Sequence, residues 1–356
     1  MKTHKHLYPT VTSFENLYQA FKKAAKGKRS QAAVAAFEFN LEANLFRLQE
    51  ELQAKSYRHG DYDSFYICDP KHRLISAAPF RDRVVHHALV RVIEPIFERS
   101  FIPDSYANRV GKGTHAALGR CQEFARRYRY VLQCDIRQFF PSIDHAVLRA
   151  ILARKVGDPD VLWLADRILE SGVGVLSGEY EMTYFPGDDL FAAARPRGLP
   201  IGNLTSQFWA NCYLNPLDHL IQRELGCQAY LRYVDDLLLF SDSKGQLWGW
   251  KGGVQNSVAG LRVTLHEQEN TVYPVSNGIP FLGFRVYPPH RRLKRANGLA
   301  FARRFRRQCA ALACSEMTFE ELDRRVQGWI AHAAHGDTYR LRRSLFSATI
   351  VPRRPL

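Results

Sequence analysis

Three aspartates interrupt apolar stretches of the sequence, where a charge is costly to bury without a partner. Asp135 lies near the end of YVLQCDI (130–136), and Asp235 and Asp236 lie inside LRYVDDLLLF (231–240). Strand alternation places adjacent carboxylates on opposite faces, but a tight turn can direct both toward one point. Carboxylate oxygens suit Mg²⁺, and two such ions can activate a 3′-hydroxyl and stabilise a leaving pyrophosphate. The pattern therefore indicates metal-dependent phosphoryl transfer.

Acidic residues in such positions also occur in proteins that hold no metal there. A lone Asp-Asp pair is most often part of a hairpin turn, and two separated carboxylates can serve a glycosidase. The apolar residues on both sides of Asp235 and the second acidic strand at Asp135 favour a shared metal site. Nothing else in the sequence supports the glycosidase alternative.

The charge balance of the chain indicates a polyanionic partner. Lys and Arg number 50 against 35 Asp and Glu, which gives a formal net charge of +15. Each phosphate that a cation neutralises releases counterions, so such an excess favours nucleic acid over a merely soluble basic surface. The seven cysteines form no C-x-x-C pair, so no zinc site is expected. Without a secretory leader or a long apolar run, we expect a cytoplasmic protein that does not contact a membrane.

Hydrophobic periodicity predicts alternating helices and short strands. The apolar spacing predicts helices over 13–60, 84–97, 145–155, 160–171 and 203–225, the second kinked or ended by Pro95. The β-branched and aromatic stretches predict a strand pair over 65–75, a strand over 130–136, a hairpin over 229–241 and short strands over 260–287. Residues 172–197 are expected to form a long loop or a hairpin, and long loops in compact domains are often functional. A basic, helical composition after residue 290 marks a candidate domain boundary.

Five segments, taken in order, resemble the motifs of reverse transcriptases. Y-V-D-D (233–236) resembles motif C, and D-I-R-Q-F-F (135–140) resembles motif A. RGLPIGNLTSQFWANCYLNPLD (197–218) is similar to motif B, PKHRLISAAPFRDRVVHHAL (70–89) to the fingers motif, and GIPFLGFRVYP (278–288) to the primer-grip region. Any one motif is a weak signal, but the ordered set is specific.

The resemblance implies an α/β (α+β) right-hand polymerase fold. Residues 1–130 would form an N-terminal extension and helical fingers, 131–290 the palm, and 291–356 a basic helical thumb. The palm would be an antiparallel sheet with helices on one face. The implied reaction is synthesis of cDNA from dNTPs on an RNA template, starting from a nucleic-acid primer. An RNA-binding protein that kept an inactive polymerase fold is the non-enzymatic alternative.

The same resemblance implies roles for individual residues. Asp135, Asp235 and Asp236 would be the catalytic metal ligands for two Mg²⁺ ions, with Mn²⁺ as a substitute and the Ile136 carbonyl as a further ligand. Phe140 would exclude a ribose 2′-hydroxyl, unless it only packs in the core. The other implied nucleotide contacts are Lys71, Arg73, Arg81, Ile201, Gly202 and Gln207, of which the three basic residues could instead form surface ion pairs. The implied nucleic-acid contacts are Phe281, Gly283, Arg303, Arg304, Arg306 and Arg307.

Departures from the commonest motifs indicate a subfamily. The sequence I-G-x-x-x-S-Q (201–207) stands where many reverse transcriptases have Q-G-x-x-x-S-P, and it resembles the enzymes of diversity-generating retroelements. SFENLYQAFKKAAKGKR (13–29) and GWIAHAAHGDTYRL (328–341) are also similar to those enzymes, whereas retron and maturase features are absent. This resemblance implies frequent errors opposite template adenine and a small basic helical-bundle accessory protein. A defence-associated reverse transcriptase is the alternative. The motif D lysine is not evident in LHEQEN (265–270), so His266 is a weak candidate for the pyrophosphate acid.

Overall fold

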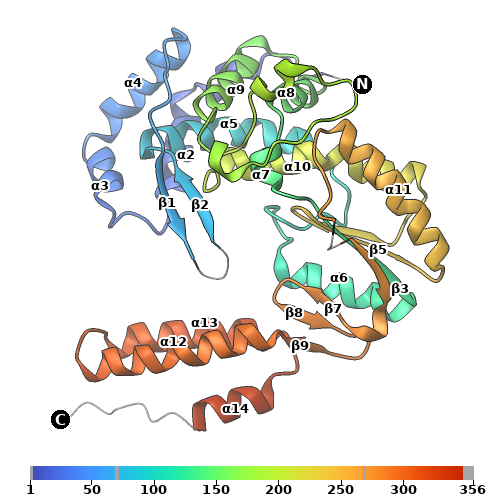
Figure 1. Cartoon of the computed structure of the whole chain (residues 1–356). Helices are drawn as coiled ribbons and strands as arrows, with labels where there is room; N and C mark the ends of the chain where they lie inside the picture. Colours follow the sequence, from blue (N-terminus) through green and yellow to red (C-terminus); the bar gives the residue numbers. More distant parts are fainter. Residues whose placement is uncertain (1–2, 69–71, 268–269, 348–356) are drawn as a thin grey trace.

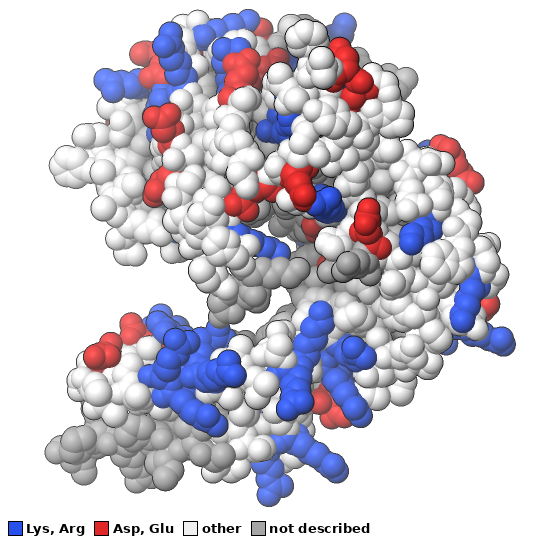
Figure 2. All heavy atoms as spheres, in the orientation of Figure 1, with Lys and Arg blue, Asp and Glu red and all other residues white. Residues whose placement is uncertain are grey.

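The computed structural model describes residues 3–68, 72–267 and 270–347. Figure 1 shows an upper part built mainly of helices, a sheet at one side, and a lower part that consists of the C-terminal helices. Figure 2 shows that the molecule is hollowed between the upper part and the lower helices. Within these described ranges no helix is long and apolar enough to cross a membrane.

The predicted N-terminal helical region consists of three helices rather than one continuous stretch. They are α2 (Phe14–Ala25), α3 (Ala32–Phe39) and α4 (Leu41–Gln53), after a single turn at α1 (Tyr8–Val11). The Ser13 hydroxyl accepts a hydrogen bond from the Asn16 N–H, which caps the start of α2. Leu45, Leu48 and Leu52 are fully buried, as their helical spacing predicts. These helices pack around α5 (Phe80–Glu98), which continues past Pro95 for one turn.

The strand pair predicted near residues 65–75 is confirmed. Strands β1 (Asp63–Ile67) and β2 (Arg73–Ala77) are antiparallel, with Phe65 opposite Ile75. In Figure 1 this hairpin extends from the upper part toward the space above the lower helices. Residues 69–71, which include Lys71, lie outside the described residues.

The central sheet has the strand order β4-β5-β3-β6, and each pair is antiparallel. Its strands are β3 (Tyr130–Asp135), β4 (Tyr230–Tyr233), β5 (Asp236–Ser241) and β6 (Thr271–Pro274). The order places the predicted strand that ends in Asp135 directly beside the predicted hairpin. The two acidic segments therefore meet in the middle of the sheet and not at its edge.

Both faces of the central sheet are covered, which corrects the expectation of helices on one face. One core joins Leu132, Leu237 and Leu239 to α8 (His145–Ala153), α9 (Pro159–Ser171), α10 (Leu204–His219) and α11 (Lys244–Gly260). A second core joins Val131 and Leu238 to α6 (Thr114–Arg127) and a small sheet. Apolar residues at successive positions of β3 and β5 face opposite cores, so these strands carry apolar residues on both faces.

Helix α11 was not predicted from the sequence. Its segment KGQLWGWKGGVQNSVAG contains several glycines, each of which disfavours a helix by about 1 kcal/mol relative to alanine. Burial of Leu247, Val254 and Val258 and the Ser243 cap offset this preference. Chain packing thus overrides local propensity here. Residues 260–270 contain no strand among those described, and the predicted short strands begin only at β6.

The C-terminal region begins with strands and continues as helices. Strands β7 (Ile279–Phe281), β8 (Phe284–Val286) and β9 (Arg291–Leu293) form the small sheet. Helices α12 (Arg295–Ala313), α13 (Phe319–Ala333) and α14 (Tyr339–Ser347) follow and have their own core. In that core the Phe301 and Trp329 rings stack with centroids 3.7 Å apart. The predicted boundary near 290 falls between β8 and β9, so the basic segment still contributes one strand to the small sheet.

Candidate active site

The strand register brings the predicted metal ligands together. Asp135, the last residue of β3, is directly opposite Asp236, the first residue of β5. Asp236 also pairs with Tyr233 on its other side, so Val234 and Asp235 form a two-residue turn between β4 and β5. Residues directly opposite one another in an antiparallel pair have their side chains on the same face of the sheet. The carboxylates of Asp135 and Asp236 therefore share one face, with Asp235 in the adjoining turn.

The turn that carries Asp235 has an unfavourable backbone conformation. Val234 has φ of 56°, in the left-handed region that a β-branched residue rarely adopts. Such a conformation costs about 1–3 kcal/mol and persists only where surrounding contacts hold it. The position of Asp235 therefore depends on whatever fixes the Val234 backbone.

The donor chemistry of this site suits a hard divalent cation. Asp135, Asp235 and Asp236 are each half-buried, and like charges placed directly opposite one another in a sheet destabilise it unless they are neutralised. A divalent ion would supply that neutralisation through oxygen ligands. Across the described residues, no three His, Cys, Asp or Glu side chains form a ready-made metal centre. The fit therefore rests on the opposed strand positions and the adjoining turn.

A segment that follows α11 fixes the end of β3. The Asp135 N–H donates to the Asn270 Oδ1 at 3.0 Å, and the His266 N–H donates to the Asp135 carbonyl at 2.8 Å. Ile136, whose carbonyl was predicted as a metal ligand, is buried and forms an antiparallel bridge with Leu265. Asn270 was missed from the sequence because no motif marked it. His266 is adjacent to Asp135 through the backbone, and its buried Nδ1 has no hydrogen-bond partner in the described structure.

The loop predicted to face the incoming nucleotide is attached to strand β2. The Ser76 N–H donates to the Ile201 carbonyl at 2.8 Å. Gly202 has φ of 116°, and a Cβ there would lie 3.1 Å from Ile75 Cγ2, so a glycine is required at this position. Asn203, which the prediction did not single out, is buried and bonds to both segments. Its Nδ2 donates to the carbonyls of Ser76 and Pro200, and its Oδ1 accepts from the Ala78 N–H.

The two phenylalanines of the DIRQFF segment have different surroundings. Phe139 is only 2% exposed and packs against Tyr213, so it belongs to the core. Phe140 is half-buried, and its carbonyl accepts a hydrogen bond from the Leu199 N–H at 2.9 Å. That bond connects the segment after Asp135 to the loop containing Ile201. The expectation that one of the two rings packs in the core is met by Phe139.

The basic residues predicted to contact a triphosphate differ in what they touch. Lys71 lies outside the described residues. Arg73 is exposed on β2. Arg81, near the start of α5, forms an ion pair with Glu51 and lies over the Tyr57 ring, 5.4 Å from its centroid. The ion-pair alternative therefore applies to Arg81, which must leave Glu51 to reach a phosphate.

Gln207 lines a cavity of about 190 Å³ between the loop, α2 and α5. Arg83, His87 and Lys28 line the same cavity. Burial, together with the positive charges of Lys23 and Lys28, lowers the pKa of His87 to about 4. The histidine is therefore neutral at physiological pH, and the charge of this cavity comes from its lysine and arginine side chains.

The structure corrects one of the two predicted contacts in the segment 278–288. Phe281 is only 1% exposed and packs edge-on against Tyr233, so its ring has no surface to offer to a nucleic acid. Gly283 lies in the β7–β8 turn with φ of 86°, and its carbonyl accepts hydrogen bonds from the Lys294 N–H and the Asn297 Nδ2. Both residues thus position neighbouring elements. The apolar context of Phe281 could have indicated this from the sequence.

The predicted basic contacts of the C-terminal helices lie on the surface. Arg303, Arg304, Arg306 and Arg307 are all exposed on α12. Figure 2 shows Lys and Arg gathered on the lower helices, including the side that faces the hollow. The upper rim of the same hollow carries both acidic and basic side chains. Basic side chains therefore dominate only on the lower side of the hollow.

Arg232 was also missed from the sequence, although an arginine inside the apolar segment LRYVDDLLLF could have drawn attention to it. It is fully buried and forms an ion pair with the equally buried Asp218. Burial opposes its charge, but the attraction and hydrogen bonds of Asp218 outweigh this and raise the pKa of Arg232, with a further contribution from Asp235. A permanent positive charge therefore lies beneath the acidic turn.

Comparisons with known proteins agree with this arrangement. A sequence profile described as "Reverse transcriptase (RNA-dependent DNA polymerase)" matches residues 68–286. Protein YkfC of Escherichia coli (strain K12) is 25% identical over 284 residues, which cover 67% of this chain and 70% of YkfC. The group II intron-encoded protein LtrA of Lactococcus lactis subsp. cremoris is 24% identical over 212 residues, or 59% of this chain and 33% of LtrA. The chain thus spans about a third of the length of LtrA.

Among solved structures, apo telomerase from Candida tropicalis aligns with 65% of this chain and 48% of its own, at a TM-score of 0.47 and 10% identity. A form of that telomerase truncated from its C-terminal domain aligns with 69% of this chain and 59% of its own, at a TM-score of 0.48.

Proposed function

The chain belongs to the reverse transcriptase (RNA-dependent DNA polymerase) family, and we propose that it synthesises cDNA on an RNA template from a nucleic-acid primer. The observation that carries this proposal is the register that places Asp135 opposite Asp236, with Asp235 in the adjoining turn. These are the positions at which the sequence resembles motifs A and C. The segment that matches the family, residues 68–286, contains all three aspartates.

The three carboxylates would hold two divalent cations, with Mg²⁺ the proposed ions and Mn²⁺ a substitute. When bound, the ions supply Lewis acidity that favours the primer 3′-alkoxide and the leaving pyrophosphate. Asp135 and Asp236 would place their oxygens on one face of the sheet, and Asp235 would add a ligand from the turn. The Ile136 carbonyl remains a proposed further ligand. The bridge to Leu265 holds the Ile136 backbone in place next to Asp135.

The nucleotide would lie between the β4–β5 turn and the loop 200–203, next to the β2 strand to which that loop is bonded. Arg73 is proposed to contact the triphosphate, and Arg81 would do so after leaving Glu51. Planar guanidinium groups match phosphate oxygens with two parallel hydrogen bonds. Phe140 would exclude a ribose 2′-hydroxyl, which its partial exposure and its bond to Leu199 support.

The chain would be divided as fingers (1–130), palm (131–290) and thumb (291–356). The separate core of α12–α14 supports a distinct thumb. The exposed arginines of α12 would bind the template–primer duplex through its phosphates, which makes the affinity dependent on salt.

Within the family we propose the diversity-generating retroelement type, which implies errors at template adenines and a basic helical-bundle accessory protein. The sequence I-G-x-x-x-S-Q and its tight attachment to β2 support this proposal. A defence-associated reverse transcriptase is the second candidate. The similarity of SFENLYQAFKKAAKGKR (13–29) and GWIAHAAHGDTYRL (328–341) to the retroelement enzymes also supports the first candidate.

Primer extension with purified protein tests the proposed function. An RNA template with an annealed primer, dNTPs and Mg²⁺ should yield full-length cDNA, and chelation of the metal should stop synthesis. Failure to extend on RNA, with retained RNA binding, would favour the non-enzymatic alternative. Sequencing the cDNA then separates the two subtypes, because only the retroelement type is expected to accumulate errors opposite adenine.

A further inference from the structure

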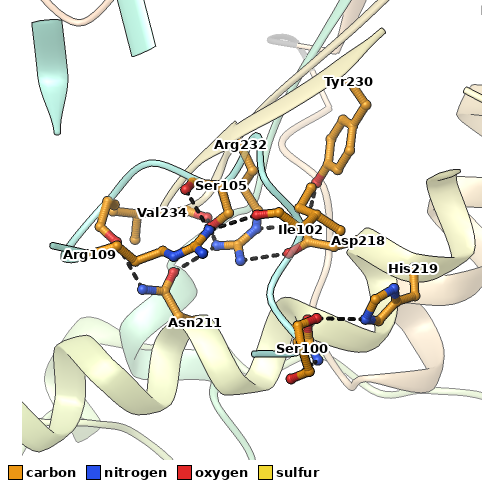
Figure 3. A network of polar contacts seen from close by, with 12 residues as sticks. Ser100, Ile102, Ser105, Arg109, Asn211, Asp218, His219, Tyr230, Arg232 and Val234 are labelled. Carbon is orange, nitrogen blue, oxygen red and sulfur yellow. Dashed lines mark hydrogen bonds and ion pairs between the residues drawn. The ribbon is translucent and has the colours of Figure 1, made fainter. Parts of the chain in front are cut away.

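A buried polar network lies directly beneath the turn that carries Asp235 (Figure 3). Arg232 donates to Asp218 in a fork, from Nε to Oδ1 at 2.8 Å and from Nη2 to Oδ2 at 2.7 Å. Its Nη1 donates to the Asn211 Oδ1 at 3.1 Å and to the Val234 carbonyl at 3.0 Å. The Tyr230 hydroxyl donates to the Asp218 Oδ1 at 2.7 Å. The network thus joins the end of α10 to the β4–β5 turn.

Every charged member of this network is removed from solvent. Arg232 and Asp218 are 0% exposed, and Asn211 is 2% exposed. Taking two charges out of water is costly, and a buried pair can often be replaced by apolar residues without loss of stability. Stability alone therefore does not explain why an arginine occupies this strand. A role in positioning does explain the arginine. Only a guanidinium can form two parallel hydrogen bonds to a carboxylate and donate two further hydrogen bonds in the same plane.

The bond from the Arg232 Nη1 to the Val234 carbonyl indicates what the arginine positions. The Val234 carbonyl belongs to the residue with the strained backbone, immediately before Asp235. The Arg232 backbone is also held, because its N–H donates to the Asp104 carbonyl at 2.9 Å and its carbonyl accepts from the Tyr106 N–H at 3.0 Å. Both ends of the arginine are thus fixed before it contacts the turn. Val234 in turn receives a bond from a group that cannot move.

We propose that Arg232, oriented by Asp218 and Asn211, is a positioning residue that holds the Val234 backbone and thereby sets the direction of the Asp235 carboxylate toward the metal ions. This inference rests on the proposed function, because it assumes that Asp235 ligates a metal. Arg232 itself touches neither metal nor nucleotide. Its effect is on the geometry of the ligand, so its loss should weaken metal binding more than nucleotide binding.

The test compares two conservative arginine substitutions in the full-length chain. Arg232→Lys keeps a positive charge near Asp218 but cannot maintain the fork and both further bonds. The matched control is Arg109→Lys: Arg109 is also largely buried and forks onto a carboxylate, Glu98. Its remaining bonds go to the carbonyls of Ile102 and Ser105 and not to the turn. Both arginines appear in Figure 3.

Metal binding is measured without chemistry, from the Mn²⁺ concentration that half-saturates binding in an electron paramagnetic resonance titration. We expect Arg232→Lys to raise this concentration about tenfold, which corresponds to about 1.4 kcal/mol. Arg109→Lys should leave it within about twofold of wild type even if its thermal midpoint falls equally. In primer extension, Arg232→Lys should lower kcat at fixed Mg²⁺ while KM for dNTP changes little. Excess Mg²⁺ should recover part of the loss.

A milder variant keeps the inference testable if Arg232→Lys does not fold. Asn211→Ala keeps the Arg232–Asp218 pair and removes one of the contacts that orient Nη1, so a smaller rise of the same sign is expected. Unchanged Mn²⁺ affinity in Arg232→Lys would overturn the inference. If Arg232→Lys does not fold, unchanged Mn²⁺ affinity in Asn211→Ala would overturn it. Arg109 holds the 102–106 segment to which the Arg232 backbone is bonded, so an equal loss in Arg109→Lys would assign the effect to that segment and overturn a role for the Arg232 side chain. A wild-type chain that extends no primer would instead refute the proposed function, and the Mn²⁺ titration would still decide the positioning role.

Discussion

The β4–β5 turn and the loop 200–203 lie on either side of the proposed nucleotide site, and they are held in different ways. The turn is held by a buried charged network that belongs to the same part of the molecule, through α10 and β4. The loop is held by neutral hydrogen bonds to β2, which belongs to another part. Breaking a buried ion pair costs about 3–5 kcal/mol, whereas a neutral hydrogen bond contributes about 1 kcal/mol net.

The difference corresponds to two different tasks. Metal ligands must keep one geometry throughout the reaction, so the turn requires a rigid support that is costly to break. The loop is proposed to face a base pair that changes at every step of synthesis. Neutral bonds between two parts of the molecule can be exchanged at low cost, so the loop can adjust. We therefore expect changes at the turn to abolish synthesis and changes at the loop to alter its accuracy.

The largest effect is expected from Asp235→Asn, which removes a charged ligand while the turn keeps its shape. Metal stabilisation of the transition state is worth several kcal/mol, so the rate of primer extension should fall about a thousandfold or more. The circular dichroism spectrum and unfolding midpoint should change little. Asp166→Asn, on the surface pair with Arg149, is the control and should retain activity. Activity of the Asp235 variant within about tenfold of wild type would refute the metal assignment.

The second prediction concerns Phe140, which connects the two regions through its bond to Leu199. Phe140→Ala should open space for a 2′-hydroxyl and lower the ratio of dNTP to rNTP incorporation efficiency by about tenfold or more, the equivalent of about 1.4 kcal/mol. Phe139→Ala is the matched control, because it should destabilise the core by about 3–5 kcal/mol and leave the ratio unchanged. If the ratio falls for Phe139→Ala instead, the gate is at that residue.

The third prediction separates the loop from β2. Asn203→Ala removes three hydrogen bonds and leaves the Ala78 N–H and the Ser76 carbonyl without this partner. The free energy of unfolding, measured in urea, should fall by about 2 kcal/mol, while the Mg²⁺ requirement of synthesis stays the same. Asn215→Ala on the same helix is the control, since Asn215 makes only a 3.5 Å contact to the Ser100 hydroxyl. A changed Mg²⁺ requirement would show that the loop and the turn are not independent.

Much of this arrangement could be predicted from the sequence, because acids in apolar strands are rare and costly. The pairing of the Asp135 strand with the Asp235 hairpin followed from these residues and from their resemblance to known motifs. What brings the loop to β2 could not be predicted, since Asn203 is one polar residue among several in its segment. Helix α11 was missed because its glycines conceal a buried apolar face.

The role of buried residues was the other part that the sequence did not reveal. Phe281 was predicted to contact nucleic acid, but it packs against Tyr233 beneath the turn. Arg232 directly precedes the Y-V-D-D motif, and its place in an apolar segment marks it as unusual but does not reveal its buried partners. Periodicity reports which face of a strand is apolar, but it does not report which polar group completes a buried network. Such groups are visible only when α10, β4 and the turn are seen together.

The smallest effect is expected at Ile201, whose carbonyl accepts from Ser76 while its side chain is half-buried. An isoleucine side chain can neither donate nor accept a hydrogen bond, whereas a glutamine could add a polar contact next to the nascent base pair. One such bond contributes about 1 kcal/mol, so Ile201→Gln should lower the error rate opposite template adenine several-fold. Ile201→Leu is the control and should leave it unchanged.

Sequencing cDNA made by wild type and by both variants on one adenine-rich RNA measures these error rates directly. High adenine error that persists in Ile201→Gln would keep the retroelement type and place the cause of infidelity elsewhere. Low error that does not depend on the template base in the wild type would favour the defence-associated alternative. If Ile201→Gln instead slows synthesis as much as Asp235→Asn, the loop is as rigidly required as the turn, and the contrast between a fixed metal platform and an adjustable loop is wrong.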